Sequence, residues 1–504
     1  MTKKLVFAGV ILIVLFHFYI ISFETVSYPF FGDDWDLLSV VRKFSISNLN
    51  QWGDLILPFH GGVHSHLLTK IFALSYFTIF NEIDYKALVL ISSLLILVIY
   101  TVYFKYLKLL KKNSFHFLTI AFILFSLKGN LDNFNLGGIM QHNNVSICFI
   151  TLISYLVVVQ KKCYAGVFLG ICYLLFVSSE AIGVLLISNL CCFLFAIRGR
   201  VILLGISLGT IVLYYFGVRI SQEILGAHSA GMVLNWGIFV APFIFMGGIF
   251  TNIKLAGITG FLLFLSILIP TVYPKKPWRD YILGVDLFIP MVALSIASVG
   301  IILQVNKGTS ALGAVDFSIL TNTRFSLYHL LAILLGFLST IKWLDNKFTV
   351  IHMGIFCMAG FYYLVNIVQF YPTIIFDKER VLADIYNYNQ NNFSVLYYLN
   401  PDMIHNNKKT NWMYVPTESL NLNNFKAEPV KQSTFDFLGS DFVNLMIELP
   451  QKSLGNYFLL ETKKRKIIVC AKTSNHLGFS VLFNRKSFDE LGEFNISKLT
   501  KLDH

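Results

Sequence analysis

The stretch YPFFGDDWDLLSVVRKFSISNLNQWGDLILPFHGGVHSHLLTK (residues 28–70) lies between two long apolar runs, 5–22 and 86–107. It brings aspartates and histidines together in one predicted loop: Asp33, Asp34, Asp36, His60, His64 and His66. Ionisable side chains are costly to bury beside lipid, and those that gather at the mouth of a helical bundle are typical of functional sites. We therefore predict that this loop is an active site.

The composition excludes a single water-soluble core. Of the 504 residues, 56% are hydrophobic and only 13% are charged, which predicts a polytopic membrane protein. The formal net charge of +12 would favour nucleic acid in a soluble protein, but most lysines and arginines lie in short links between apolar runs. We therefore exclude nucleic acid as a partner. The cysteines form no metal-ligand spacing and no disulfide framework, and we interpret the adjacent Cys191 and Cys192 as lipid-facing or packed rather than redox-active.

Several apolar runs are long enough to be predicted as membrane spans, because a bilayer of about 30 Å needs about 17–25 helical residues. The predicted spans are 5–22, 86–107, 115–128, 144–160, 163–179, 181–197, 201–218, 254–273, 281–303, 325–341 and 349–371.

Charge on the links predicts the orientation of these spans. The N-terminal MTKK has no small-residue cleavage site after its apolar run, which predicts a retained first helix that starts in the cytoplasm. Every second link is then cytoplasmic, and these links are the basic ones, as positive-inside topology requires. Their charges are Lys105, Lys108, Lys111, Lys112, Lys161, Lys162, Arg198, Arg200, Lys275, Lys276, Arg279, Lys342 and Lys347.

Residues 236–253 are apolar enough to span, but a span here would reverse every later link. We interpret this segment as a re-entrant or interfacial element on the outer side, since Pro242 and Gly247-Gly248 would interrupt a straight helix.

The composition changes at Tyr371-Pro372, where polar residues become abundant and apolar runs shorten to strand length. The runs SVLYYL, FVNLMIEL, YFLLET, KIIVCA and FSVLF predict strands. The predicted fold class is an all-α polytopic membrane bundle over 1–371, with an outer catalytic loop over 23–85, and an extracytoplasmic α+β domain over 372–504.

Asp33 and Asp34 directly precede the amphipathic stretch WDLLSVVRKF. Helix capping would explain one aspartate there, but it explains two adjacent ones less well. We predict a catalytic or metal-binding role, because a carboxylate is a natural base for taking a proton from a sugar hydroxyl. A divalent metal at this pair stays open.

His60, His64 and His66 enclose Gly61-Gly62 with a spacing that is compatible with zinc, although no fixed metal motif supports it. The working hypothesis is contact with a phosphate at the membrane surface, with Lys70 as a supporting charge. Ordinary polar loop residues are the alternative.

Three further residues are candidates at the outer side. His142 lies in the second outer loop (129–143), where an ordinary turn is the alternative. Glu180 lies in a turn between two spans and must either reach water or pair. Arg324 begins a span from the outer side, where its planar fork suits a phosphate and snorkelling to the interface is the alternative.

A retained first helix, the acidic motif Gly32-Asp33-Asp34-Trp35 in a long first outer loop, about eleven spans and a terminal extracytoplasmic domain together resemble the GT-C superfamily of integral membrane glycosyltransferases. The size and the two large outer regions look most like the serotype-converting O-antigen glucosyltransferases of enteric bacteria and their phages.

This resemblance implies a bacterial inner-membrane enzyme that takes a hexose such as glucose from undecaprenyl phosphate. The acceptor would be a lipid-linked or surface polysaccharide such as O-antigen at the periplasmic face, and the transfer would invert the anomeric centre. The acidic motif of the family falls on Asp33 and Asp34. The resemblance supplies no fixed pattern for the basic phosphate contacts, so His64, Lys70 and Arg324 are hypotheses. Trp412, Tyr397 and Tyr398 would stack on the acceptor glycan.

Two other functions compete with this interpretation. An O-antigen polymerase or ligase also works outside on undecaprenyl-linked glycan, but those proteins resemble bundles with an arginine-rich loop further along the chain. A non-enzymatic lipid or sugar transporter is the third hypothesis, against which stand the folded outer domain and the charged outer loop.

Overall fold

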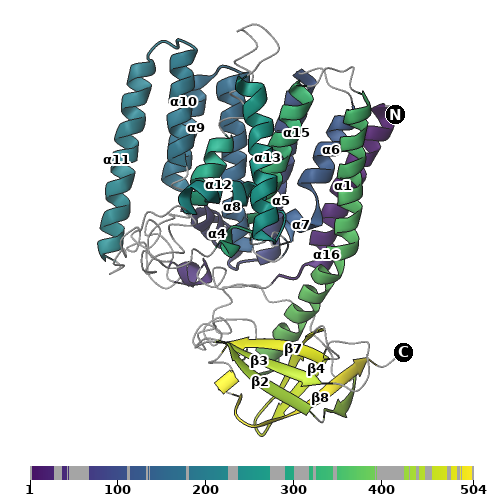
Figure 1. Cartoon of the computed structure of the whole chain (residues 1–504). Helices are drawn as coiled ribbons and strands as arrows, with labels where there is room; N and C mark the ends of the chain where they lie inside the picture. The colour runs from purple at the N-terminus through teal and green to yellow at the C-terminus, as the bar shows by residue number, and fades with distance from the viewer. Residues whose placement is uncertain are drawn as a thin grey trace.

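Apolar helices form a bundle at one end of the molecule, and β strands form a sandwich at the other (Figure 1). A single long helix connects the two parts. The computed structural model describes residues 3–27, 37–42, 44, 67–109, 114–131, 134, 137–177, 181–224, 237–272, 290–299, 317–321, 325–343, 349–391, 393, 425–430, 432–438, 442–448, 457–473, 478–484, 488–489 and 491–501.

The prediction of a mostly helical chain with apolar helices is confirmed. Four helices among the described residues are long and apolar enough to cross a membrane: α1 with its π-helical extension η1, α5, α11 as far as Gly217, and α16. The helices are α1 (Lys3–Tyr19), η1 (Ile20–Glu24), α4 (Leu67–Phe80), α5 (Tyr85–Leu109), α6 (Phe115–Leu124), α7 (Leu127–Asn130), α8 (Gly137–Ser154), η3 (Tyr155–Val159), α9 (Cys163–Phe176), α10 (Ala181–Leu194), α11 (Arg200–Ile224), α12 (Gly237–Met246), α13 (Ile253–Val272), η5 (Ser318–Thr321), α15 (Ser326–Trp343) and α16 (Thr349–Asn391), with a further helix over Pro290–Val299.

Polar side chains inside the bundle bond from helix to helix. The amide of Asn144 on α8 donates to the hydroxyl of Ser92 on α5 over 2.6 Å, and the amide of Asn189 on α10 donates to Ser207 on α11 over 2.8 Å. Such bonds satisfy groups that neither lipid nor an apolar core can satisfy. They link neighbouring helices in a bundle that exposes many large apolar side chains on its outer surface.

The segment predicted to be re-entrant (236–253) contains α12 and the turn after it, and α12 forms a tight hairpin with α13, which covers the predicted span 254–273. With 10 residues, α12 rises about 15 Å, half of a bilayer core of about 30 Å. The helix runs through Pro242 and ends at Met246, so the proline is tolerated and the glycines end it. A Cβ on Gly260 would lie 1.7 Å from the carbonyl oxygen of Phe243, so only glycine permits this packing.

In its described residues, the predicted outer loop 23–85 is helical at two places between Glu24 and Tyr85. Residues 37–42 are helical, and α4 covers Leu67–Phe80. α4 is apolar, but its 14 residues are fewer than a straight span needs, and span length was the criterion applied to the sequence. The helix packs instead with the start of α5 and with α16 in a separate apolar cluster.

The C-terminal strands form two four-stranded antiparallel sheets, in the orders β1-β8-β4-β5 and β2-β3-β7-β6. The predicted strands FVNLMIEL, YFLLET, KIIVCA and FSVLF correspond to β3, β4, β5 and β7, while SVLYYL lies outside the described residues. The strands are β1 (Phe425–Pro429), β2 (Gln432–Leu438), β3 (Phe442–Glu448), β4 (Tyr457–Thr462), β5 (Lys466–Cys470), β6 (Lys472–Thr473), β7 (Gly478–Asn484) and β8 (Phe494–Lys501).

Alternation along β4 lets one sheet pack on both of its faces. Phe458 and Leu460 point between the sheets, where they join Leu445 and Ile447 of β3 in one core. The intervening Leu459 points to the opposite face and packs with Ala383 of α16, as successive strand residues must. The last turns of α16 are therefore part of the sandwich domain.

α16 passes through the composition change at Tyr371-Pro372 as one helix of 43 residues with Pro372 inside it. Its far end is fixed to the sandwich by Asn387, whose amide donates to the carbonyl oxygen of Ile468 over 2.7 Å and accepts from the N–H of Ile468 over 2.8 Å. One turn later, the amide of Asn391 donates to the carbonyl oxygen of Lys466 over 2.7 Å. These bonds occupy the outer edge of β5, an edge strand of its sheet.

Candidate functional site

The structure places both flanks of the predicted acidic stretch, although Asp33, Asp34 and Asp36 themselves lie outside the described residues. On one side Ser27 is buried, and on the other side Leu37 is buried. Leu37 and Val41 pack in one apolar cluster with Ala73 of α4 and Ile385 of α16. The residues between 28 and 36 thus connect two fixed positions beside α16.

Glu24 connects α1 with α16 just before this stretch. Its carboxylate accepts a hydrogen bond from the hydroxyl of Tyr371 over 3.0 Å and forms an ion pair with the ammonium of Lys378 over 3.0 Å. The same ammonium donates to the carbonyl oxygen of Phe23 over 2.6 Å. A carboxylate with two strong partners is stabilised in its charged form, so Glu24 serves as a fixed link and is poorly suited to act as a base.

Lys70, predicted in a loop, lies on α4 with only 1% of its surface exposed. Lysine is almost never buried to that degree unless it is paired. Lys70, Ala73 and Leu74 follow the spacing of one helix face, and this is the face that packs in the cluster with Leu37 and Leu38. α4 therefore places the buried Lys70 on the helix face that packs near Leu37, the first described residue after the acidic stretch.

The structure does not describe the side chains of the other predicted site residues. His60, His64, His66, Glu180 and Arg324 lie outside the described residues. His142 was predicted in a loop, but the backbone there belongs to helix α8, and its side chain is outside the described part. Trp412, Tyr397 and Tyr398 are outside it too. Their roles stay predictions.

A cation that the sequence reasoning missed lies on α7, the one-turn helix after α6. The backbone N–H of Lys128 donates to the side-chain oxygen of Asn366 on α16 over 3.1 Å. Its ammonium, which is partly buried, donates to the carbonyl oxygen of Ile249 in the turn between α12 and α13. Among the described residues, no carboxylate forms an ion pair with Lys128.

His329 of α15 lies on the other side of the same turn. Its Nε2 is 2.9 Å from the carbonyl oxygen of Leu320 in η5, and the ring is buried. A Cβ on Gly248 would lie 2.4 Å from this Nε2, so glycine lets the turn lie against the imidazole. Lys128 and His329 thus contact the turn between α12 and α13 from two sides.

The available donors define what this end of the bundle can bind. An ammonium has three N–H donors, and one of those on Lys128 is taken by Ile249. A partly buried cation with no carboxylate partner among the described residues favours an anion beside it. Because Lys128 ends an apolar run, the sequence reasoning counted it as the end of a span. A lysine at a helix end that the sequence predicts to be outer departs from the positive-inside bias, and this was the signal that could have revealed it.

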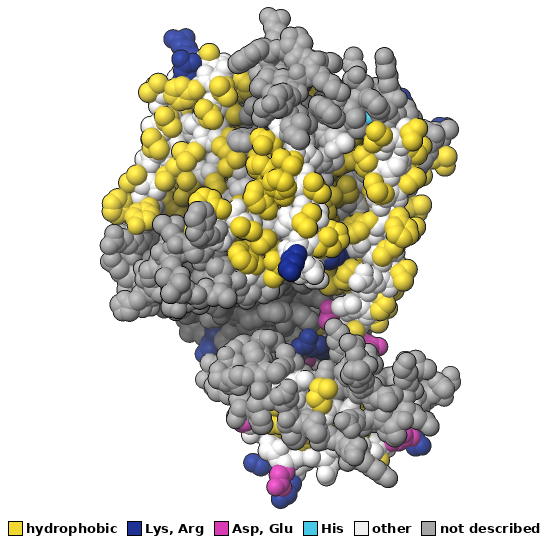
Figure 2. Space-filling model, in the orientation of Figure 1, with side chains coloured by type: hydrophobic (Ala, Val, Ile, Leu, Met, Phe, Trp, Pro, Cys, Tyr) yellow, Lys and Arg dark blue, Asp and Glu magenta, His cyan; other side chains and the backbone are white. Residues whose placement is uncertain are grey.

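The surface shows the same division. Hydrophobic side chains cover much of the visible face of the bundle, acidic side chains lie where the bundle meets the sandwich and on the sandwich itself, and basic side chains lie there and also at the opposite end of the bundle (Figure 2). Within the described residues, no group of three His, Cys, Asp or Glu side chains could hold a metal ion.

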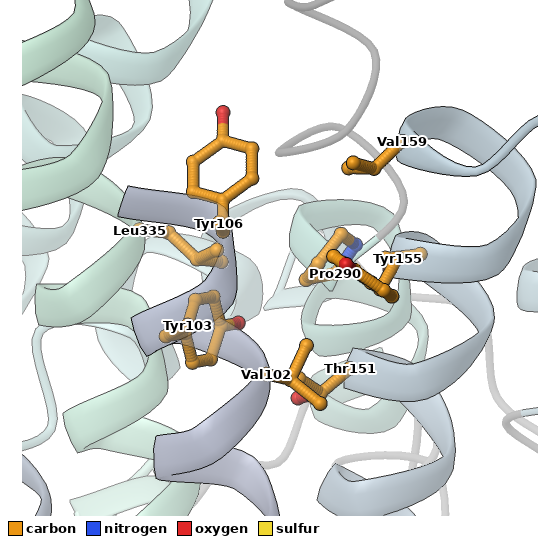
Figure 3. Close-up of a pocket in the computed structure, with 9 residues that line it drawn as sticks. Val102, Tyr103, Tyr106, Thr151, Tyr155, Val159, Pro290 and Leu335 are labelled. Carbon is orange, nitrogen blue, oxygen red and sulfur yellow. The ribbon is translucent and has the colours of Figure 1, made fainter. Parts of the chain in front are cut away.

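A hollow near the other end of the bundle is not a candidate for a sugar site. Tyr103 and Tyr106 of α5, Thr151 of α8, Tyr155 of η3 and Leu335 of α15 are among the residues that line it (Figure 3). Its cavity of about 20 Å³ has room for about one water molecule. The charged end next to the sandwich is therefore the better candidate.

Comparison with known proteins returned no relative, because no family model, no curated protein and no solved structure matches this chain.

Proposed function

We propose that this chain is a membrane glycosyltransferase of GT-C-like architecture, with about eleven spans, in a bacterial inner membrane. It moves a hexose such as glucose from undecaprenyl phosphate to O-antigen or a related surface polysaccharide. In this proposal the N-terminus is cytoplasmic, and the charged end of the bundle and the sandwich are periplasmic.

The observation that carries the proposal is that buried or partly buried lysines and the described carboxylates of the bundle helices lie at the end of the apolar bundle that meets the sandwich. The flanks of the acidic stretch, the buried Lys70 and the partly buried Lys128 all belong to elements that pack on α16 or around α7. A lipid-linked donor reaches an enzyme from the bilayer and carries its phosphate at the interface. A site at the mouth of the bundle, next to a water-exposed domain, suits a donor from lipid and an acceptor from water.

The chemistry requires one base and one or more cations. The hydroxyl oxygen of the acceptor attacks the anomeric carbon, and its proton passes to the carboxylate of Asp33 or Asp34. The bond between the anomeric carbon and the phosphate oxygen breaks at the same time, and undecaprenyl phosphate leaves with the bonding pair. Lys128 and Lys70 stabilise the charge on that phosphate. A single displacement of this kind inverts the anomeric centre.

Conservative aspartate variants test the base. Asp33→Asn and Asp34→Asn keep size and hydrogen-bonding capacity, and asparagine caps helices about as well as aspartate. Loss of the base lowers the transfer rate about 10²–10⁴-fold. The measurement is hexose transfer from synthetic undecaprenyl-phosphate donor in membranes with matched protein levels. Near-normal transfer by both variants would remove the catalytic claim, and sensitivity to a chelator would assign the pair to a metal.

A matched lysine pair tests the phosphate contact. Lys128→Met removes the partly buried ammonium, while Lys254→Met removes an exposed one near the same turn. We expect a large loss of transfer in Lys128→Met and near-normal transfer in Lys254→Met. Near-normal transfer by Lys128→Met, equal to that of Lys254→Met, would show that Lys128 does not bind the phosphate and only supports the turn.

The same membranes separate the competing functions. Movement of lipid or sugar across liposomes without any transfer would indicate a transporter. Joining of whole glycan blocks in place of single hexoses would indicate a polymerase or ligase.

A further inference from the structure

The hollow at the end of the bundle far from the sandwich contains a buried hydroxyl (Figure 3). Thr151 of α8 lines the hollow with 2% of its surface exposed, and its Oγ1 has no hydrogen-bond partner among the described residues. A buried hydroxyl that stays unsatisfied costs free energy, so such groups nearly always bond to the protein or to an ordered water molecule. Thr151 is therefore expected to bind a partner in this hollow.

The size and the lining of the hollow indicate which ligand fits. Its volume of about 20 Å³ admits one water molecule, for which about 10–15 Å³ in this measure is enough. Tyr103 lines it from α5, and its hydroxyl oxygen points toward the α8 side (Figure 3). Ser154 lines it from α8 and donates to the carbonyl oxygen of Ile150 over 2.6 Å. A hydroxyl oxygen that donates can still accept, so a water molecule here meets about three polar partners, as buried waters typically do.

The hollow also lies close to the end of its helix. Its lining extends from Thr151 to Val159, the last residue of η3, which is about 12 Å further along the chain axis. Lys161 and Lys162 follow directly and are exposed. η3 is a π-helix, and π turns that continue an α-helix are frequent at functional sites. The hollow therefore lies between an exposed, charged link and a buried hydroxyl.

We propose that one ordered water molecule occupies this hollow and bridges α8 to α5. The hydroxyl of Thr151 donates to the water oxygen, and the water donates to the hydroxyl oxygens of Tyr103 and Ser154. A bridging water is enthalpically nearly as good as a direct hydrogen bond. It also places water inside the segment 144–160, which the sequence predicts to be an apolar span, so the dry part of that segment ends near Thr151. This site does not depend on glycosyl transfer.

Water-edited solid-state NMR of the full-length protein in lipid vesicles tests the site directly. Thr151-Leu152 is the only Thr-Leu pair in the sequence, so threonine labelled with ¹³C at the carbonyl and leucine labelled with ¹⁵N give one signal that needs no variant for its assignment. We expect this signal to build up from water faster than that of Thr119. Thr119 is the matched control, because it is equally buried and its hydroxyl donates to the carbonyl oxygen of Phe115 over 3.1 Å. Its signal is assigned by its loss in Thr119→Val.

The wild-type spectrum alone can overturn the proposal. A Thr151 signal that builds up from water as slowly as that of Thr119 would show that the hollow is dry. A signal that builds up faster from the acyl chains than from water would show that a lipid chain fills the hollow instead.

The stability of an isosteric variant tests the same water by the sign of the change. Thr151→Val keeps the shape of the side chain and removes the hydroxyl, so the bridge is lost and the apparent Tm should fall by about 1–2 °C. Ser146→Ala is the control, because Ser146 Oγ is buried without a partner among the described residues and Ser146 is not among those that line the hollow. Its Tm should stay unchanged or rise. A rise in Thr151→Val would show that the hydroxyl is unsatisfied in the folded protein and would contradict the bridge.

Discussion

The two halves of α16 satisfy opposite demands with one uninterrupted helix. From Val350 to Val368, large apolar side chains point outward, and Val368 is 79% exposed. From Ile374 to Tyr388 the apolar side chains are buried or half-buried, while Asn389 and Gln390 are exposed. Lipid surrounds the first half in our proposal, and water surrounds the second. A change in amino-acid composition along the chain can therefore mark a change of solvent without ending the helix in which it occurs.

The largest expected effect comes from a charge in the lipid-facing half. Phe361 is exposed on the bundle, so Phe361→Asp should disfavour membrane insertion by about 3 kcal/mol. Gln390→Asp places the same charge on the exposed sandwich half and should change insertion and folding by less than about 0.5 kcal/mol. The measurement is the membrane-inserted fraction of each variant. Equal insertion would show that the two halves do not meet different solvents.

The next effect tests the sandwich half. Asn387→Leu removes a buried side chain that satisfies both backbone groups of Ile468, and unsatisfied groups there should cost about 2–3 kcal/mol of unfolding free energy. Asn391→Leu removes a single, more exposed bond to Lys466 and should cost less than about 1 kcal/mol. Denaturant unfolding of the purified protein measures both. Similar losses would mean that α16 rests on the sheet through apolar contact alone.

A smaller effect is expected where the halves meet. Glu24 and Lys378 form their ion pair over 3.0 Å with side-chain exposures of 13% and 31%. A double-mutant cycle with Glu24→Gln and Lys378→Met should give a coupling of about 1 kcal/mol. Thermal unfolding at low and high salt measures it, and the coupling should fall as salt rises. A coupling that salt leaves unchanged would indicate packing of the lysine stem.

The smallest effect concerns Lys498 of β8, a strand of the sheet on which the second half of α16 packs. Its side chain is buried in register with Phe458, and burial lowers the pKa of its ammonium. Lys498→Met should therefore stabilise the domain by up to about 1 kcal/mol. The unfolded chain keeps the ordinary, higher pKa and binds more protons between the two values, so wild-type stability rises with pH just below pH 10.4 or so. The methionine variant should lack this rise.

Much of the fold could be predicted because its signals are local. Apolar runs identified the helices, and alternation identified β3, β4, β5 and β7. β8 was missed because Lys498 occupies an inward position of FNISKLTK and because Leu499 faces α16, so neither face of the strand looks regular. α4 was missed because its apolar run is shorter than a span. In both cases the partner that explains the pattern lies far away in the sequence.

The candidate site was less predictable because its cations depend on tertiary contacts. Lys70 was chosen for its charge near the histidines, and no sequence feature indicated that it would be buried on a helix face. Lys128 became a candidate site residue only through its hydrogen bonds to Ile249 and Asn366, which are distant in sequence. The acidic pair was visible from composition alone, and its role is still a prediction.

α16 runs from the bundle into the sandwich as one continuous helix. The number of residues in it therefore sets the rotation of the sandwich about the helix axis as well as its distance from the bundle. Its 43 residues extend about 64 Å, and each residue adds about 1.5 Å and about 100° of rotation. One extra residue near Tyr371 would swing the sandwich by more than a quarter turn and direct a different face toward the membrane. Only insertions close to a whole number of turns, such as about seven residues for two turns, would restore the orientation of the sandwich, and they would place it further from the bundle. The length of α16 therefore sets both the rotation of the sandwich about the helix axis and its distance from the bundle.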